Sequence, residues 1–102
     1  MTEPKKPTIK TAKLELKDDF AGWTFTARMN PPLGVFFDIA SGDLQRIAKG
    51  IARIIIAWNF PDEDGQPLPA PSLEVLTDNL TSEGLNAVAN AWLDEMTRVP
   101  PV

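Results

Sequence analysis

Two stretches near the start of the chain alternate between apolar and polar residues. In the first, Leu14 and Leu16 are separated by charged side chains. In the second, the apolar positions are Trp23, Phe25, Ala27 and Met29. A period of two indicates half-buried β-strands, because successive side chains of a strand point to opposite faces. About five residues that include a glycine join the two stretches, so the sequence predicts a β-hairpin over residues 11–29.

Two later segments place apolar residues three and four positions apart, which marks one face of an α-helix. In residues 42–58 this stripe consists of Leu44, Ile47, Ala48, Ile51, Ala52, Ile55 and Trp58. In residues 82–97 it consists of Leu85, Val88, Ala89, Trp92 and Met96. We expect Ser41 to cap the first helix, with Asp43 in its first turn, and Thr81 to cap the second. Side chains of this kind accept hydrogen bonds from the free N–H groups of a helix start.

Prolines and small polar residues mark the connections between these elements. Two consecutive prolines after Asn30 end the second strand, because proline has no N–H to donate to a ladder. The apolar residues 33–40 are too few to show a periodicity, so a short helix and an extended connector both remain open. Several prolines and acidic residues predict an irregular loop over residues 59–71. Ser72 is then expected to open a short helical turn.

Together these elements predict a single α+β domain, in which an N-terminal β-hairpin packs on two main helices with short connecting helices. The domain covers residues 11–98 of the 102-residue chain, between a flexible polar tail at residues 1–10 and a C-terminal tail at residues 99–102. The positions expected to be largely buried are Leu14, Leu16, Trp23, Phe25, Ile47, Ile51, Ile55, Val88 and Trp92. Gly50 lies inside the first main helix, where glycine costs about 1 kcal/mol relative to alanine. Close packing of another backbone would explain it.

Charge and composition exclude several classes of partner. The net charge is −4 and the chain carries no basic footprint, so we expect no nucleic-acid binding. The sparse lysines near the N-terminus indicate a solubilising tail. No apolar run approaches the length of about 18 residues that a membrane span needs, so no membrane contact is expected. The first residues lack the apolar segment of a signal peptide, which favours synthesis in the cytosol.

Candidate catalytic and metal-binding residues fail on spacing or on missing partners. Residues 62–65 read Asp-Glu-Asp-Gly, but an EF-hand loop needs glycine at position 6 and glutamate at position 12. Counted from Asp62, the glycine falls at position 4 and Leu73 at position 12. All three serines are expected at helix caps, and the chain has neither a histidine to activate them nor a cysteine. We therefore expect no enzymatic activity, no cofactor and no bound metal.

The surplus of apolar side chains at the end of the middle helix is the most informative feature. Ile54, Ile55 and Ile56 would spread over about 200° of the helix surface, because each residue turns by about 100°. Either part of this surface stays exposed and binds a partner protein or a second copy, or residues 33–40 fold over it and complete the core. The candidate interface residues are Ile54, Ile56, Trp58, Phe36 and Phe37.

The order of these features resembles the small tail assembly chaperones of long-tailed bacteriophages. The resemblance extends over about residues 11–98 and depends on two motifs. The hairpin ends in Arg-Met-Asn-Pro-Pro at residues 28–32. The middle segment ends in Trp-Asn-Phe at residues 58–60, followed by Asp-Glu-Asp-Gly-Gln-Pro-Leu-Pro at residues 62–69.

This resemblance implies an assembly factor that acts in the cytoplasm of the infected host cell. Proteins of this family coat the hydrophobic, largely helical tape measure protein and bring tail tube subunits to it. They are absent from the mature virion, and many are also made in a longer, frameshifted form. Applied to this chain, the resemblance implies these two protein partners, with self-association as a further expectation.

Two other functions remain open from the sequence. One is a structural virion protein, such as a head–tail connector or a minor tail component. Such a protein would need an arm that threads a ring, and only residues 59–71 could serve as one. The other is an unrelated regulatory or antitoxin-like adaptor, which a dedicated partner outside the tail would reveal.

Overall fold

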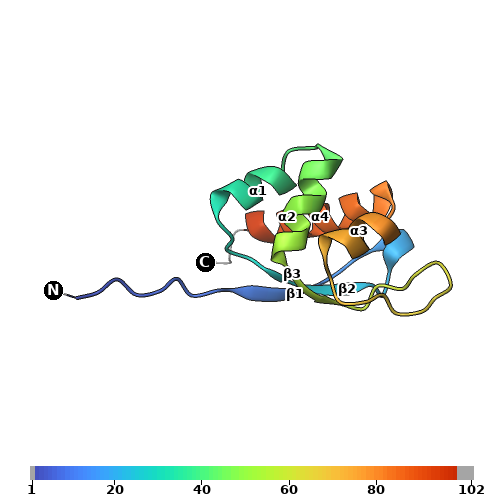
Figure 1. Ribbon diagram of the computed structural model, residues 1–102, viewed down its shortest axis with the longest axis horizontal. Helices are drawn as coiled ribbons and strands as arrows, with labels where there is room; N and C mark the ends of the chain where they lie inside the picture. The colour runs from blue at the N-terminus through green and yellow to red at the C-terminus, as the bar shows by residue number, and fades with distance from the viewer. Residues whose placement is uncertain (1, 99–102) are drawn as a thin grey trace.

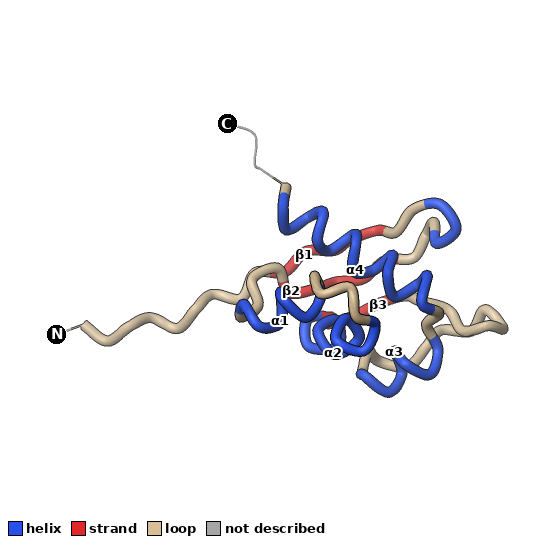
Figure 2. The backbone as a smooth tube through the Cα atoms, turned by 90° about the horizontal axis from the view of Figure 1, so that it is seen from above, coloured by secondary structure: helices blue, strands red, loops and turns tan. Residues whose placement is uncertain are grey.

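A computed structural model describes residues 2–98, and it forms an α+β fold in two layers (Figure 1). The sheet has the order β1-β2-β3, with β1 at Thr11–Glu15, β2 at Thr24–Arg28 and β3 at Ile55–Trp58. The helices are α1 at Leu33–Ile39, α2 at Leu44–Ile54, α3 at Leu73–Asn79 and α4 at Ser82–Thr97. They lie on one face of the sheet, where α4 runs above β1 and β2 while α2 and α3 lie on the β3 side (Figure 2). The predicted fold class is confirmed.

The N-terminal hairpin forms as predicted. β1 and β2 are antiparallel, with Leu14 opposite Phe25 and Ala12 opposite Ala27, and these side chains face the helices. The pairing continues beyond β1, because the Leu16 N–H donates to the Trp23 carbonyl oxygen at 2.8 Å. A short 3-10 helix, η1 at Asp18–Phe20, makes the connection between the strands.

The predicted helix over residues 42–58 is wrong in its last four residues. α2 ends at Ile54, and the chain continues directly as β3, which pairs with β2. Ile55 lies opposite Ala27 and Ala57 lies opposite Thr26, so Ile56 is the extra residue of a β-bulge. β-branched and aromatic residues favour strands, and a two-stranded hairpin is marginal without a third strand. Pairing with the hairpin therefore overrides the helical periodicity.

The helix starts follow the predicted caps with one exception. Asp43 rather than Ser41 caps α2, since its side chain accepts a hydrogen bond from the Arg46 N–H at 3.1 Å. Ser41 lies two residues earlier, where its hydroxyl donates to the Asp38 carbonyl oxygen and accepts from the Asp43 N–H. The cap of α4 at Thr81 is confirmed, and Ser72 caps α3.

Residues 33–39 form a helix, which settles the alternative that the sequence left open. α1 packs closely on α2 at Gly50. A Cβ atom at Gly50 would lie 2.6 Å from Ile39 Cγ1 and 3.3 Å from the Val35 carbonyl oxygen. The glycine is therefore explained by the close approach of α1, as the sequence suggested.

The core lies between the sheet and the helices. Seven of the nine predicted core residues are buried, while Leu14 and Trp23 are partly buried. Trp92 is fully buried and its Nε1 donates to the Arg28 carbonyl oxygen at 2.9 Å, which joins α4 to β2. Within residues 2–98 no buried residue is polar or charged.

The chain before β1 extends away from the domain (Figure 1). Asn30 holds its last residues, because its side chain accepts from the Lys10 N–H at 2.8 Å and donates to the Thr8 carbonyl oxygen at 2.6 Å. The flexible tail predicted for residues 1–10 stays a prediction. The C-terminal tail predicted for residues 99–102 lies outside the described residues.

Candidate protein-binding surface

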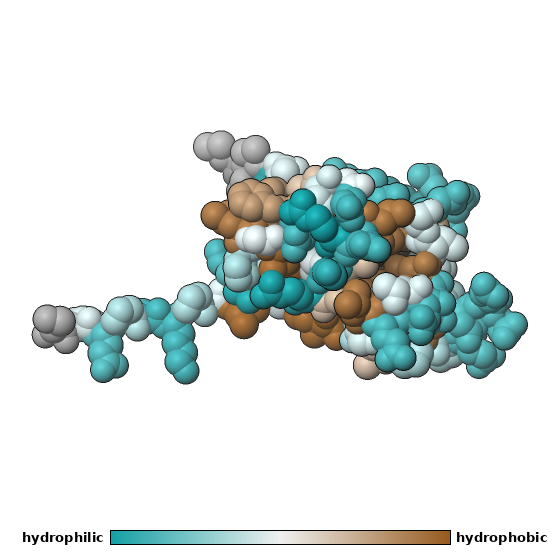
Figure 3. Space-filling view, turned by 45° about the horizontal axis from the view of Figure 1, so that its top comes forward, coloured by the Kyte–Doolittle hydropathy of each residue, from teal (hydrophilic) through white to brown (hydrophobic). Residues whose placement is uncertain are grey.

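Helix α1 is apolar on both of its faces. Val35 and Ile39 are buried beneath it, while Leu33 and Phe37, four residues apart on the other face, are 70% and 56% exposed. Phe36 lies between these faces and is partly buried, with its ring centroid 5.9 Å from that of Trp92 and 6.2 Å from that of Phe37. We call Leu33, Phe36 and Phe37 the α1 surface. Figure 3, tilted to bring the helices forward, shows apolar surface on this side interrupted by hydrophilic side chains.

The local sequence fixes the position of this helix. Pro32 precedes its first turn, and the Pro32 carbonyl oxygen accepts a hydrogen bond from the Val35 N–H at 3.0 Å. At the other end, Asp38 forms an ion pair with Arg46 of α2 at 3.0 Å. With Gly50 allowing close packing, α1 is held against α2 with Leu33 and Phe37 facing outward.

Ile54 belongs to the core, not to an interface. It is 1% exposed, because α2 ends at this residue and its side chain packs into the core cluster between helices and sheet. Its inclusion among the candidate interface residues depended on the helix continuing to residue 58, and that continuation is wrong. Ile56, by contrast, is 54% exposed at the β-bulge of β3.

Trp58 has a structural role that the sequence did not reveal. Its Nε1 donates to the Pro69 carbonyl oxygen at 2.8 Å, and its ring stacks on Phe60 with centroids 4.9 Å apart. Trp58 is partly buried as a result. The five candidate residues therefore do not form one patch. Phe36 and Phe37 lie in the helical layer, whereas Ile56 and Trp58 lie in the sheet (Figure 1).

The acidic segment after Trp58 is a closed turn. Asp62 Oδ1 accepts hydrogen bonds from the N–H groups of Asp64 at 2.9 Å and Gln66 at 2.8 Å. Pro61 and Pro67 form an isolated bridge, and the Leu68 N–H donates to the Phe60 carbonyl oxygen at 3.0 Å. The carboxylate of Asp62 thus organises the turn itself. In the part of the chain that the structure describes, no three His, Cys, Asp or Glu side chains gather to hold a metal ion.

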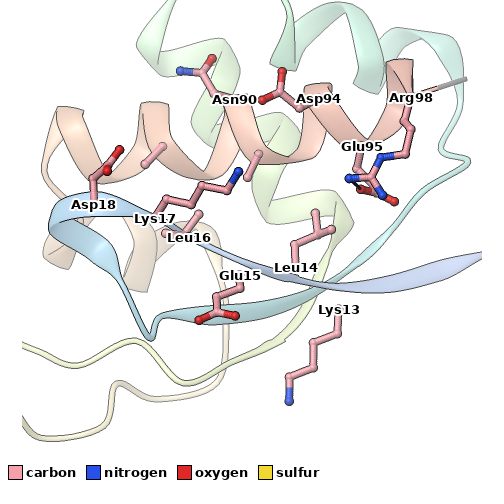
Figure 4. Close-up of a pocket in the computed structure, with 12 residues that line it drawn as sticks. Lys13, Leu14, Glu15, Leu16, Lys17, Asp18, Asn90, Asp94, Glu95 and Arg98 are labelled. Carbon is pink, nitrogen blue, oxygen red and sulfur yellow. Dashed lines mark ion pairs between the residues drawn. The ribbon is translucent and has the colours of Figure 1, made fainter.

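Two grooves were not predicted. One, of about 230 Å³, is apolar and is lined by α2, α3 and α4, with Leu44 and Leu85 among its residues. The other, of about 450 Å³, lies between β1 and α4 (Figure 4). Its apolar residues are Leu14, Leu16, Ala87 and Ala91. The four-residue spacing of Ala87 and Ala91 was a readable signal, whereas residues 33–40 were too few to show a periodicity, and only the packing shows which positions stay open.

Comparison with protein-family models, curated proteins and solved structures finds no match to this chain. The resemblance to tail assembly chaperones therefore stays a prediction, and so does the absence of catalysis. Among the described helices, none is long and apolar enough to cross a membrane.

Proposed function

We propose that this protein is a non-catalytic assembly factor that binds apolar segments of another protein, namely a tail assembly chaperone of a long-tailed bacteriophage. The observation that carries this proposal is the α1 surface. Leu33 and Phe37 project from one face of a helix that α2 holds in place. Exposed apolar side chains that gather on one element are typical of protein-binding sites.

The chemistry of this surface suits an amphipathic helix as the partner. A partner helix presents apolar side chains at spacings of three and four, which match the four-residue spacing of Leu33 and Phe37. Full burial of one such side chain contributes roughly 1.5–3 kcal/mol. Burial of Leu33 and Phe37 together gives only a modest gain in free energy, and association also loses translational and rotational freedom. This balance favours a contact that forms and dissociates during assembly.

The charge distribution supports a shielding role. Residues 54–97 contain eight acidic residues and neither lysine nor arginine. The net charge of −4 helps to keep a complex with an apolar partner in solution, because complexes of like charge repel one another. By the family resemblance, the partner is the tape measure protein and the subunits brought to it are those of the tail tube. This activity would take place in the cytoplasm of the infected host cell.

Co-expression with the candidate tape measure protein tests the proposal. The protein to test as the candidate is any long, helix-rich, alanine-rich product of a neighbouring gene. We expect the wild type to raise the fraction of the candidate in the soluble supernatant and to co-purify with it. Phe37→Asp should reduce the recovered complex at least tenfold.

Leu73→Asp is the matched control, because Leu73 is 41% exposed on α3 and receives the same kind of change at a distance from α1 along the chain. It should bind as the wild type does. A wild type that leaves the candidate insoluble, or equal binding by both variants, would contradict the proposal.

The alternative of a structural virion protein is addressed by the loop at residues 59–71. Asp62 and the bridge between Pro61 and Pro67 fold this loop back on itself, a geometry that does not favour an arm threading a ring. Mass spectrometry of purified particles separates the two functions. We expect the protein to be absent from them, and a stoichiometric amount would favour the virion component.

A further inference from the structure

Strand β1 has an open hydrogen-bonding edge. The sheet order places it at one side, and no strand within residues 2–98 pairs with its outer edge. Toward β2, the Leu16 N–H donates to Trp23 and the Lys10 carbonyl oxygen accepts from Met29. Residues of an antiparallel strand alternate in the direction of their N–H and C=O groups. The N–H and C=O groups of the even-numbered residues of β1 therefore point to β2. Those of Thr11, Lys13 and Glu15 point to the open edge.

The groove beside this edge can receive the side chains of a further strand. Leu14 points from β1 toward α4, while Lys13 and Glu15 point away from it (Figure 4). Ala87 and Ala91 line the groove on the α4 side, where their small side chains leave room. Helix α4 lies above the sheet rather than in its plane (Figure 1) and crosses over β1 when seen from above (Figure 2), so it does not occupy the hydrogen-bonding edge of β1. A regular, exposed edge of this kind is a template for strand addition.

We propose that β1 pairs antiparallel with β1 of a second copy of this chain, about a twofold axis at Leu14, to form a continuous six-stranded sheet. On the face away from the helices, Lys13 then lies opposite the partner's Glu15, and Glu15 lies opposite the partner's Lys13. Both residues are exposed in the single chain and can meet without rearrangement of the fold. Opposite charges directly across a strand pair stabilise it, and a twofold axis makes the interface self-complementary.

The charges select this register over its neighbours. The alternation of N–H and C=O directions requires an odd-numbered residue opposite an odd-numbered one. A register centred on Lys13 would oppose two lysines, and one centred on Glu15 would oppose two glutamates. A register centred on Leu16 would pair Glu15 with Lys17, but the chain leaves the strand direction there, because Lys17 precedes η1 and Asp18 has a φ of 55°.

The inner face fits the same register. Leu14 lies opposite the partner's Leu14, and Ala12 lies opposite the partner's Leu16. These side chains extend the apolar part of the groove under α4. Leu14 is only partly buried in the single chain, and pairing would cover its remaining exposed surface.

Exchanging the charges at positions 13 and 15 tests whether the partner is a second copy of this chain and in which register the two strands pair. Lys13→Glu places two glutamates opposite each other, and Glu15→Lys places two lysines opposite each other. At the concentration where the wild type is half dimeric in sedimentation velocity, each variant should be monomeric, with at least tenfold weaker association. An equimolar mixture of the two variants should dimerise. One strand then carries glutamate at positions 13 and 15, and the strand opposite carries lysine at both positions.

A cysteine pair provides a second, independent readout, since the chain contains no cysteine. Leu14→Cys places two thiols on the twofold axis, so mild oxidation should give a disulfide-linked dimer. Ala12→Cys is the matched control, two residues away on the same face, and should remain uncrosslinked because the partner's Leu16 lies opposite it. Circular dichroism confirms that each variant is folded.

Three outcomes would overturn the proposal. They are a wild type that is monomeric at every concentration, charge variants that dimerise separately, and equal crosslinking at both cysteine positions. If only an added extended peptide occupies the edge, the occupant is a different protein and the proposal of a second copy is wrong. None of these assays contains the tape measure protein or the tail tube subunits, so their outcome is distinguishable from failure of the proposed chaperone function.

Discussion

Asn30 and Asn59 act as side-chain extensions of the sheet at opposite ends of β2. Asn30 bonds the backbone of Thr8 and Lys10. Asn59 accepts from the Thr24 N–H at 2.7 Å and donates to the Gly22 carbonyl oxygen at 3.0 Å. A carboxamide offers a donor and an acceptor like a peptide group, so each replaces a missing strand residue. Both asparagines belong to the motifs that resemble tail assembly chaperones, and the structure gives each a role in the fold.

Gly50→Ala should destabilise the protein although alanine favours helices. The added Cβ would meet Ile39 Cγ1 at 2.6 Å, and overpacking of this kind costs about 1–3 kcal/mol. Gly34→Ala is the matched control on α1, because nothing lies within 4 Å of its added Cβ. It should stabilise the protein by about 0.5–1 kcal/mol. Urea unfolding measures both changes, and a stabilising Gly50→Ala would show that α1 does not pack this closely.

At the scale of elements, the change from α2 to β3 within a run of isoleucines determines which side chains can bind a partner. Ile54 ends the helix and points into the core, and Ile55 starts the strand opposite Ala27. Ile56, at the bulge, is the isoleucine of this run that is largely exposed. A helix continuing through these residues would have placed them on three different sides. The strand instead gives the hairpin the third member that its stability requires.

Ile54→Asp and Ile56→Asp should therefore have opposite outcomes. A carboxylate at the buried Ile54 has no partner, so we expect a loss of about 4 kcal/mol or more and an unfolded protein. At the exposed Ile56 the same change should cost about 1 kcal/mol or less, mostly from the low strand preference of aspartate. Circular dichroism with urea unfolding separates them. Two folded variants would contradict the burial of Ile54.

At the scale of the whole molecule, Trp92 ties the two layers together. Its Nε1 bonds the Arg28 carbonyl oxygen at the end of β2, and its ring lies beside Phe36 of α1. The other face of the sheet has no helix over it in the described chain (Figure 1). That face carries polar side chains such as Lys13 and Thr26, in keeping with the alternation of an antiparallel sheet that faces water on one side.

Trp92→Phe should weaken the whole domain by about 2–3 kcal/mol, because it leaves a cavity and removes the partner of the Arg28 carbonyl. Trp58→Phe is the matched control. It also loses one hydrogen bond, to Pro69, but from a partly buried side chain near a loop, so about 1 kcal/mol is expected. Urea unfolding should show a single transition for both. Equal losses would mean that Trp92 does not join the layers.

The elements that depend on local patterns could be predicted from the amino-acid sequence. The hairpin follows from a period of two, and α4 follows from its apolar stripe and the cap at Thr81. The close approach at Gly50 was also readable, because glycine inside a helix needs a reason. These features depend on residues near one another in the chain, so a single sequence contains the information.

The features that depend on residues far apart in the chain could be seen only in the folded protein. The strand state of residues 55–58 comes from pairing with β2, about thirty positions earlier, and no local pattern reports that pairing. The burial of Ile54 and the exposure of Leu33 and Phe37 follow from what packs against each side chain. The candidate surface therefore kept Phe36 and Phe37 of α1 and lost Ile54, because exposure is a property of the assembled layers and periodicity describes one element at a time.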